Sequence, residues 1–239
     1  MANRTRATNI KKRFYKKNIF MVKVKICGLI TQEDAMLACQ YGADLLGFNF
    51  YEKSPRYISP AKAAEIIKTL PSNVASVGVF VGKEANEINQ ICEEAMIDIA
   101  QIHDESLCAK DFTKLRPKII KAFRVQNTFD TREIRRFYEQ TGVNTFIFDA
   151  FQKDLYGGTG KRLDVELAHK VFKEIEGFGY GFLAGGLNEK NVETTVRLLK
   201  PYGVDVASGI ESEPGKKAHD KMALFIREAK KSLCLEPGY

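Results

Sequence analysis

Two residues with reactive side chains stand at the ends of apolar, strand-like runs of this chain. Cys27 follows the run 22–26, and Asp149 follows Phe146–Phe148. In a closed parallel barrel the carboxyl ends of the strands meet in one bowl, where this thiol and carboxyl group could act as an acid–base pair. Each also has an ordinary explanation. A cysteine at a strand end is often a small buried apolar residue, and an aspartate there can cap a helix or pair with a cation.

Glycines and one arginine could bind the charged ends of a substrate. Gly185-Gly186 and Ser208-Gly209 follow the seventh and eighth strand-like runs, where such barrels often hold phosphate with backbone N–H groups. The alternative is that these glycines only permit tight turns. Arg56, in the loop after the second run, could clamp a carboxylate through its planar guanidinium, or it could be a solvated loop residue.

Three further polar residues belong to the inner face of the predicted strands. Lys25 points to the same side as Cys27, one layer deeper, because side chains alternate along a strand. A buried lysine needs a partner, so we predict an ion pair with Asp205 on the eighth run, and Lys25 could also supply positive potential near the thiol. Gln101 and His103 share a face of the fourth run. We expect them to support the site or the core, since no second histidine or acid is spaced to bind a metal.

The glycine-rich segment 157–161 resembles a nucleotide-binding loop only superficially. The first glycine of a G-x-x-x-x-G-K pattern would fall on Leu155, and Arg162 stands where that pattern needs serine or threonine. We therefore predict a mobile lid in this segment.

Alternating strand-like and helix-like segments must position these residues. The predicted strands cover 22–27, 44–50, 74–81, 98–103, 118–125, 145–150, 179–184 and 204–207. Eight helices are predicted between and after these strands. The first begins after a Thr31 cap and the second at Pro60; the third covers 84–96 and the fourth 106–115. The fifth begins near residue 130 or 131, the sixth at Asp164 and the seventh after an Asn188 cap, and the eighth covers 217–231. Eight such units of about 25 residues predict a single α/β domain over 21–239, a (β/α)8 TIM barrel. A doubly wound open sheet is disfavoured, because no G-x-G-x-x-G opens a helix after any of the strands.

Composition narrows the class of protein further. The chain has 239 residues and a net charge of +7. Residues 1–20 carry seven of the 37 basic residues and no acidic residue, so the rest of the chain has 30 of each sign. We interpret 1–20 as a disordered basic extension. The alternatives are a targeting or nucleic-acid-contacting arm, or a segment upstream of a true start at Met21. We disfavour a nucleic-acid partner because the barrel itself has no excess positive charge. Five cysteines without a disulfide or zinc pattern predict a cytoplasmic protein, and no apolar run approaches the length of a membrane helix.

Several motifs, taken together and in order, resemble the phosphoribosylanthranilate isomerase family from residue 21 to about residue 233. They are Lys25-Ile-Cys-Gly28, Gly42-Ala-Asp44 with Gly47-Phe48, Ser54-Pro-Arg-Tyr-Ile58, Gly78-Val-Phe80, Gln101-Ile-His103, Tyr156-Gly-Gly-Thr-Gly-Lys161 with Asp164, Ala184-Gly-Gly-Leu187, and 204–211 with Pro214-Gly-Lys-Lys217. The basic extension lies outside this resemblance.

The resemblance implies an enzyme of tryptophan biosynthesis without a cofactor or metal, whose partner is a small phosphorylated substrate. The reaction implied is the Amadori rearrangement of N-(5-phosphoribosyl)anthranilate to 1-(2-carboxyphenylamino)-1-deoxyribulose 5-phosphate. The family pattern makes Cys27 the general base and Asp149 the general acid. It assigns the anthranilate carboxylate to Arg56, and the phosphate to Gly185, Gly186, Ser208 and Gly209. Oligomeric state does not follow from the sequence.

The chain departs from the family pattern at a few positions, and two other functions compete. Asp104 replaces a usual glycine, Val165 an aromatic residue, Ala184 a serine and Ala218 an aspartate. The related isomerase of histidine biosynthesis, or the barrel that serves both pathways, uses aspartate at the position of Cys27 and shows a half-barrel symmetry not found here. A non-catalytic phosphate-binding barrel with a nucleic-acid-binding extension would not need both Cys27 and Asp149.

Overall fold

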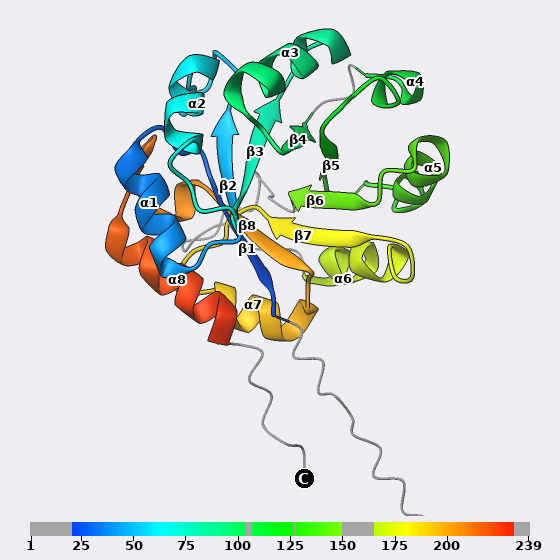
Figure 1. The fold of residues 1–239 in the computed structure, drawn as a ribbon. Helices are drawn as coiled ribbons and strands as arrows, with labels where there is room; N and C mark the ends of the chain where they lie inside the picture. The colour runs from blue at the N-terminus through cyan, green and yellow to red at the C-terminus, as the bar shows by residue number, and fades with distance from the viewer. Residues whose placement is uncertain (1–20, 104–106, 127, 150–164, 232–239) are drawn as a thin grey trace, which may run out of the picture.

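Eight parallel strands form a closed barrel in the order β1 to β8, and helices α1 to α8 surround it in chain order (Figure 1). The computed structural model describes residues 21–103, 107–126, 128–149 and 165–231. The predicted (β/α)8 barrel is therefore confirmed. The predicted disordered extension at 1–20 and the predicted lid at 157–161 lie outside the described residues, as does Asp104.

The strands are short and regularly spaced. They are β1 (Lys23–Cys27), β2 (Leu45–Asn49), β3 (Ala75–Phe80), β4 (Ile99–Ile102), β5 (Lys118–Arg124), β6 (Thr145–Asp149), β7 (Tyr180–Ala184) and β8 (Gly203–Val206). The helices are α1 (Gln32–Tyr41), α2 (Pro60–Ile67), α3 (Ala85–Ala95), α4 (Ala109–Phe112), α5 (Arg132–Thr141), α6 (Val165–Glu174), α7 (Val192–Leu199) and α8 (His219–Lys231). After β8 come a 3₁₀ turn (Ser208–Ile210) and a small antiparallel pair, β9 (Glu211–Glu213) and β10 (Lys216–Lys217).

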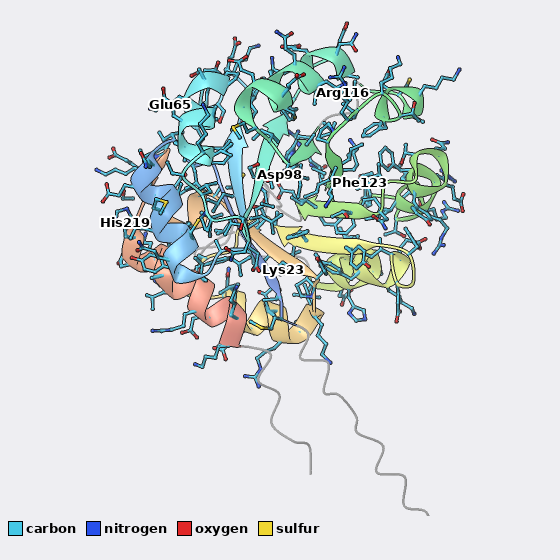
Figure 2. All side chains as sticks on the ribbon, in the orientation of Figure 1. Lys23, Glu65, Asp98, Arg116, Phe123 and His219 are labelled. Carbon is cyan, nitrogen blue, oxygen red and sulfur yellow. The ribbon has the colours of Figure 1, made fainter. Side chains whose placement is uncertain are left out.

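Alternation along each strand separates two apolar layers. Val24 and Ile26 of β1 are fully buried in the large cluster between the barrel and its helices. Residues of the opposite parity, such as Val77, Ile147 and Phe182, form a separate cluster in the barrel lumen. Charged side chains such as Glu65 project outward from the helices (Figure 2). The predicted orientation of β1, with Lys25 and Cys27 inward, is confirmed.

Local signals explain the helix starts that the sequence predicted correctly. The Thr31 hydroxyl accepts a hydrogen bond from the backbone N–H of Asp34 at 3.1 Å, which caps α1. Ser59 caps α2, and Pro60 occupies the first helical turn, where a missing N–H costs nothing.

Three predicted helix boundaries are wrong, each because a local polar contact sets the boundary instead. The helix predicted over 106–115 is a single turn, α4, because Cys108 and Asp111 form a capping box at its start and the chain leaves the helix at Thr113. Asn191, not Asn188, is the N-cap residue of α7. The Asn188 side chain instead accepts hydrogen bonds from the N–H groups of Lys190 and Asn191.

The third correction concerns the last helix, which begins at His219 rather than at Lys217. Lys217 belongs to β10, and its Nζ donates to the backbone oxygens of Cys27 and Ala207. This buried contact holds Lys217 in the β9–β10 hairpin. None of the helices in the described ranges is long and apolar enough to cross a membrane.

Candidate active site

Six of the predicted site residues line one cavity at the C-terminal end of the barrel. Its volume is about 390 Å³. Its wall includes Cys27, Asp149, Gly185, Gly186, Ser208 and Gly209. These residues come from the ends of β1, β6, β7 and β8, so barrel closure brings together positions that are up to 182 residues apart in the chain.

Cys27 ends β1 with a half-buried side chain. Its Sγ and the Nζ of Lys25 both lie beside Gly47 of the neighbouring strand β2. A Cβ atom on Gly47 would be 2.8 Å from this sulfur and 3.1 Å from this nitrogen. Cys27 pairs with Gly47 in the strand register. Glycine is thus required here because any side chain would press on the thiol and the ammonium group.

Lys25 forms the predicted ion pair with Asp205. Its Nζ lies 2.9 Å from Oδ1 of Asp205, and the Lys25 side chain has no exposed surface. Parallel pairing of β1 with β8 places the two residues side by side. Burial alone would lower the pKa of Lys25, but the negative charge of Asp205 and its hydrogen bond outweigh burial and raise it above the ordinary value. Lys25 is therefore a buried cation.

The Arg56 side chain packs against Gly28, the residue that follows Cys27. A Cβ atom on Gly28 would collide with the aliphatic part of the Arg56 side chain. Gly28 also has a positive φ of 76°, so both the available space and the backbone conformation favour glycine at this position. The Arg56 guanidinium donates to both carboxylate oxygens of Glu211, from Nε at 2.8 Å and from Nη2 at 2.6 Å. No residue in the described ranges bonds its Nη1. The predicted clamp on a substrate carboxylate stays a prediction.

Glu211 and Lys217 are site residues that the sequence analysis missed. The Nζ of Lys217 lies 2.9 Å from Oε1 of Glu211 and donates to the backbone oxygen of Cys27 at 2.7 Å. Burial would raise the pKa of Glu211, but the bonds from Arg56 and Lys217 lower it overall. Burial lowers the pKa of Lys217, only partly offset by Glu211. The sequence feature that could have indicated them is the Pro214-Gly215 turn. It joins two short strands on which Glu211 and Lys217 face each other.

Asp149 is the last residue of β6 and is half-buried. Its backbone oxygen accepts from the N–H of Val125, and the strand register sets it beside Arg124 of β5 and Ala184 of β7. The residue before it, Phe148, packs against the helices. Strand alternation therefore turns the Asp149 carboxyl group into the cavity that Cys27 also lines.

The two glycine-containing loops contact each other. Gly185 and Gly186 have φ values of 90° and 68°, which L-residues with a side chain rarely adopt. A Cβ atom on Gly209 would collide with the backbone oxygen of Leu187. The 3₁₀ turn at 208–210 therefore packs closely on the loop after β7. The amide of Asn191 donates to the Gly186 oxygen at 2.9 Å and fixes that loop from below.

Gln101 and His103 also line the cavity. Gln101 is 1% exposed, and its Oε1 has no hydrogen-bond partner among the described residues. Burial, followed by the positive charge of Lys25, lowers the pKa of His103 to about 4, so this imidazole is neutral near pH 7. The described ranges contain no group of three acidic, histidine or cysteine side chains arranged to hold a metal ion.

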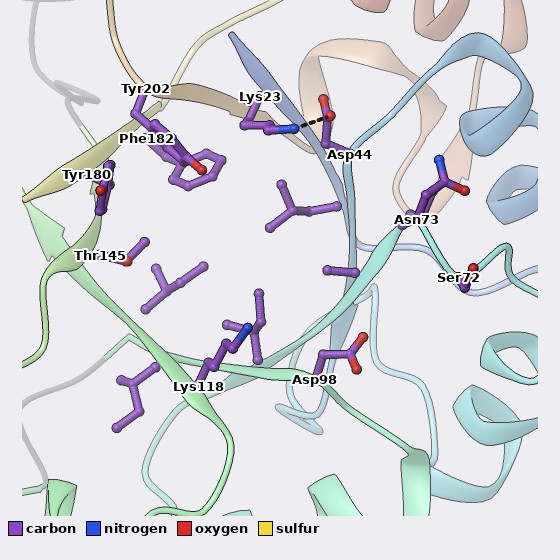
Figure 3. A pocket seen from close by; sticks show the side chains of 16 residues that line it. Lys23, Asp44, Ser72, Asn73, Asp98, Lys118, Thr145, Tyr180, Phe182 and Tyr202 are labelled. Atoms are coloured by element: carbon purple, nitrogen blue, oxygen red, sulfur yellow. Dashed lines mark hydrogen bonds and ion pairs between the residues drawn. The ribbon is translucent and has the colours of Figure 1, made fainter. Parts of the chain in front are cut away.

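Three larger cavities lie away from these residues. One, of about 530 Å³, is the open N-terminal end of the barrel, where Lys23 pairs with Asp44 and Tyr180 packs on Tyr202 (Figure 3). A second, of about 640 Å³, lies between β5 and α5 and shares only His103 with the Cys27 cavity. A third, of about 600 Å³, lies between α6, the start of β7 and the end of α7. None of the three is lined by Cys27 or Asp149. The cavity of about 390 Å³ is therefore the candidate active site.

Comparison with known proteins identifies the family to which the chain is similar. Residues 24–228 match the sequence model of the family described as N-(5'phosphoribosyl)anthranilate (PRA) isomerase. The chain is 45% identical over 214 residues to N-(5'-phosphoribosyl)anthranilate isomerase of Pelodictyon phaeoclathratiforme, covering 89% of this chain and 100% of that protein.

Solved structures give the same result. A phosphoribosyl anthranilate isomerase from Thermotoga maritima superposes with a TM-score of 0.77 at 38% identity, covering 88% of this chain and 100% of that one. Another phosphoribosyl anthranilate isomerase, in complex with reduced 1-(o-carboxyphenylamino)-1-deoxyribulose 5-phosphate, superposes with a TM-score of 0.75 at 37% identity and the same coverage.

Proposed function

The chain belongs to the N-(5'-phosphoribosyl)anthranilate isomerase family, and from this premise we propose how its side chains carry the reaction of that family. The reaction is the Amadori rearrangement of N-(5-phosphoribosyl)anthranilate, an aldose derivative, to the ketose 1-(2-carboxyphenylamino)-1-deoxyribulose 5-phosphate, a step in tryptophan biosynthesis. The observation that carries the proposal is the shared cavity of Cys27, Asp149 and the two glycine-containing loops.

The two charged ends of the substrate occupy opposite sides of Cys27 in this proposal. The phosphate binds the backbone N–H groups of Gly185-Gly186 and Ser208-Gly209, where glycine lets the main chain approach the anion. The anthranilate carboxylate binds Arg56. Because Glu211 occupies the Nε and Nη2 side of the guanidinium, the edge that includes Nη1, which no described residue bonds, receives the substrate.

Asp149 acts first, as the general acid. Its carboxyl proton passes to the ring oxygen of the furanose while the bond from C1′ to that oxygen breaks. The lone pair of the anthranilate nitrogen forms the new C1′=N bond, which leaves an open-chain iminium ion. Positioned proton transfer of this kind contributes roughly 10²- to 10⁴-fold to a rate.

Cys27 acts second, as the general base. Its thiolate takes the proton from C2′, and the two electrons of that C–H bond form the C1′=C2′ bond while the C1′=N electrons return to nitrogen. The resulting enolamine loses its 2′-hydroxyl proton and gains a proton at C1′, which gives the ketone. Only the two side chains are needed to move protons in this scheme, so we propose that the enzyme uses no cofactor.

The proposal is tested by adding purified protein to freshly prepared phosphoribosylanthranilate and following the decrease of substrate fluorescence. We expect rapid loss of the signal and formation of the ketose product, identified by mass and by its reduction with borohydride. A protein that binds the reduced product but converts no substrate would instead be a phosphate-binding barrel without catalytic function.

The location and partners of the enzyme follow from the same reasoning. Its partner is the small phosphorylated substrate. We propose a cytoplasmic location, because Cys27, Cys39, Cys92 and Cys108 are all free thiols, as expected in a reducing compartment.

A further inference from the structure

More basic than acidic side chains surround the end of β1. Three basic side chains, Lys25, Arg56 and Lys217, and two carboxylates, Asp205 and Glu211, are joined in two ion-pair groups on either side of Cys27. The first group is Lys25 with Asp205, below the thiol in the lumen. The second is Glu211 with Arg56 and Lys217, above it at the rim.

The charges of these groups leave an excess of one positive charge. Three cations face two carboxylates, and all of these residues except Arg56 are buried. A buried cluster of this kind is stabilised by one further negative charge. A thiolate on Cys27 would supply that charge, since Cys27 is among the groups whose charge affects Lys25, Arg56 and Lys217.

The Lys25 ammonium group lies close to the thiol, beside Gly47 of β2. This group and the Cys27 sulfur lie against the same face of Gly47, where a Cβ atom would touch both. Asp205 fixes the Lys25 Nζ at 2.9 Å, and the Lys25 side chain has no exposed surface, so water does not screen its charge. Lys217, by contrast, reaches the backbone oxygen of Cys27.

We propose that Lys25 is a positioning residue that holds its positive charge against the Cys27 sulfur and keeps it as a thiolate ready to remove a proton. Asp205 holds the ammonium group in place, and Gly47 leaves the space in which sulfur and nitrogen meet. The proposal deepens the proposed function, which needs Cys27 as a base. An ordinary cysteine has a pKa of about 8.5 and is only a few per cent thiolate at pH 7.

The test measures the thiolate directly and does not depend on isomerase activity. Purified protein is treated briefly with iodoacetamide between pH 5 and pH 10, and alkylation of the Cys27 peptide is quantified by mass spectrometry. We expect the midpoint of the Lys25→Met profile to lie at least one pH unit above that of the parent. The acid limb of kcat/KM against pH should move in the same direction.

Two further variants serve as controls, one for misfolding of Lys25→Met and one for the effect of the Asp205 charge. Lys25→Met leaves Asp205 buried without a partner and can fail to fold, whereas Lys25→Met combined with Asp205→Asn removes both charges together and should keep the raised midpoint. Asp205→Asn alone retains the cation and should not raise it. His103, neutral at these pH values, and Asp149, Arg56, Glu211 and Lys217 are unchanged in every variant. Equal midpoints in the parent and the double variant would overturn the proposal, even if the parent is an active isomerase.

A second inference follows from Gln101, whose buried Oε1 lies without a described partner in a wall of the same cavity. A buried carbonyl oxygen costs free energy unless it accepts a hydrogen bond. The phosphate and carboxylate of the substrate are acceptors and cannot satisfy it, so its partner must be a donor. We infer that Gln101 accepts a hydrogen bond from a hydroxyl group on the ribose part of the substrate.

Gln101→Leu separates this role from a packing role, because the two roles predict opposite changes. If Gln101 serves the substrate, the variant removes an unsatisfied polar atom, so Tm stays the same or rises. Affinity for the reduced product named above should fall about tenfold by isothermal titration calorimetry, the scale of one net hydrogen bond. A lower Tm with unchanged affinity would show instead that Gln101 is a core residue.

Discussion

Replacing Cys27 with alanine is expected to lower kcat by roughly 10²- to 10⁴-fold with little change in stability. The side chain ends its strand at the cavity and is only half-buried, so its loss removes the proposed base without opening the interior. Initial rates from the decrease of substrate fluorescence measure the loss. Cys39→Ala, at another half-buried thiol but on α1, should keep the parent rate.

A kinetic isotope effect shows which step of the reaction is slowed in Cys27→Ala. In Cys27→Ala, removal of the C2′ proton becomes strongly rate-limiting, so deuterium at C2′ should slow the remaining reaction with a full primary isotope effect. A variant that retains most of the parent rate, or one that shows no isotope effect, would mean that another group removes this proton.

The strand pattern made much of this site predictable. Val24 and Ile26 alternate with Lys25 and Cys27, which fixes the inner face of β1 without knowledge of its neighbours. Once eight strands close a barrel, β1 must pair with β8, and the only carboxylate on β8 is Asp205. A buried lysine then has one available partner. This ion pair was predictable because repeating strand geometry determines both positions.

The residues that the sequence analysis missed occur where the chain leaves repeating geometry. Glu211 lies in a hairpin after β8, and neither its strand order nor its distance from Arg56 follows from periodicity. Lys217 reads as the start of an amphipathic helix, yet its ammonium group is held by two backbone oxygens and Glu211. Contacts between residues 155 positions apart, such as Arg56 with Glu211, override local helix preference.

The same limit explains the errors at helix boundaries. Asn188 and Asn191 are both good N-cap residues, and the choice between them depends on the Gly186 oxygen, which accepts from Asn191. For α4, the Cys108–Asp111 capping box sets the start of the helix, and a cysteine is not recognised as a cap from propensity alone. Such choices rest on single hydrogen bonds, which sequence patterns do not resolve.

Asp149→Asn is expected to cause a loss of kcat of similar size, roughly 10²- to 10⁴-fold, for a different reason. Asparagine keeps the shape of the side chain at the end of β6 but has no acidic proton to give to the furanose oxygen. Ring opening then becomes the slow step. The rate is measured in the same fluorescence assay, and Asp220→Asn, an exposed substitution on α8, serves as the control and should leave kcat unchanged.

The order of the two steps makes the roles of Asp149 and Cys27 separable. In Asp149→Asn the C2′ proton leaves only after the slow ring opening, so deuterium at C2′ should have almost no effect on the rate, in contrast to Cys27→Ala. Because the slower of two successive steps limits the rate, the double variant should be about as slow as the slower single variant. Losses that multiply in the double variant would show that both residues act in one step, and the proposed sequence of acid before base would then be wrong.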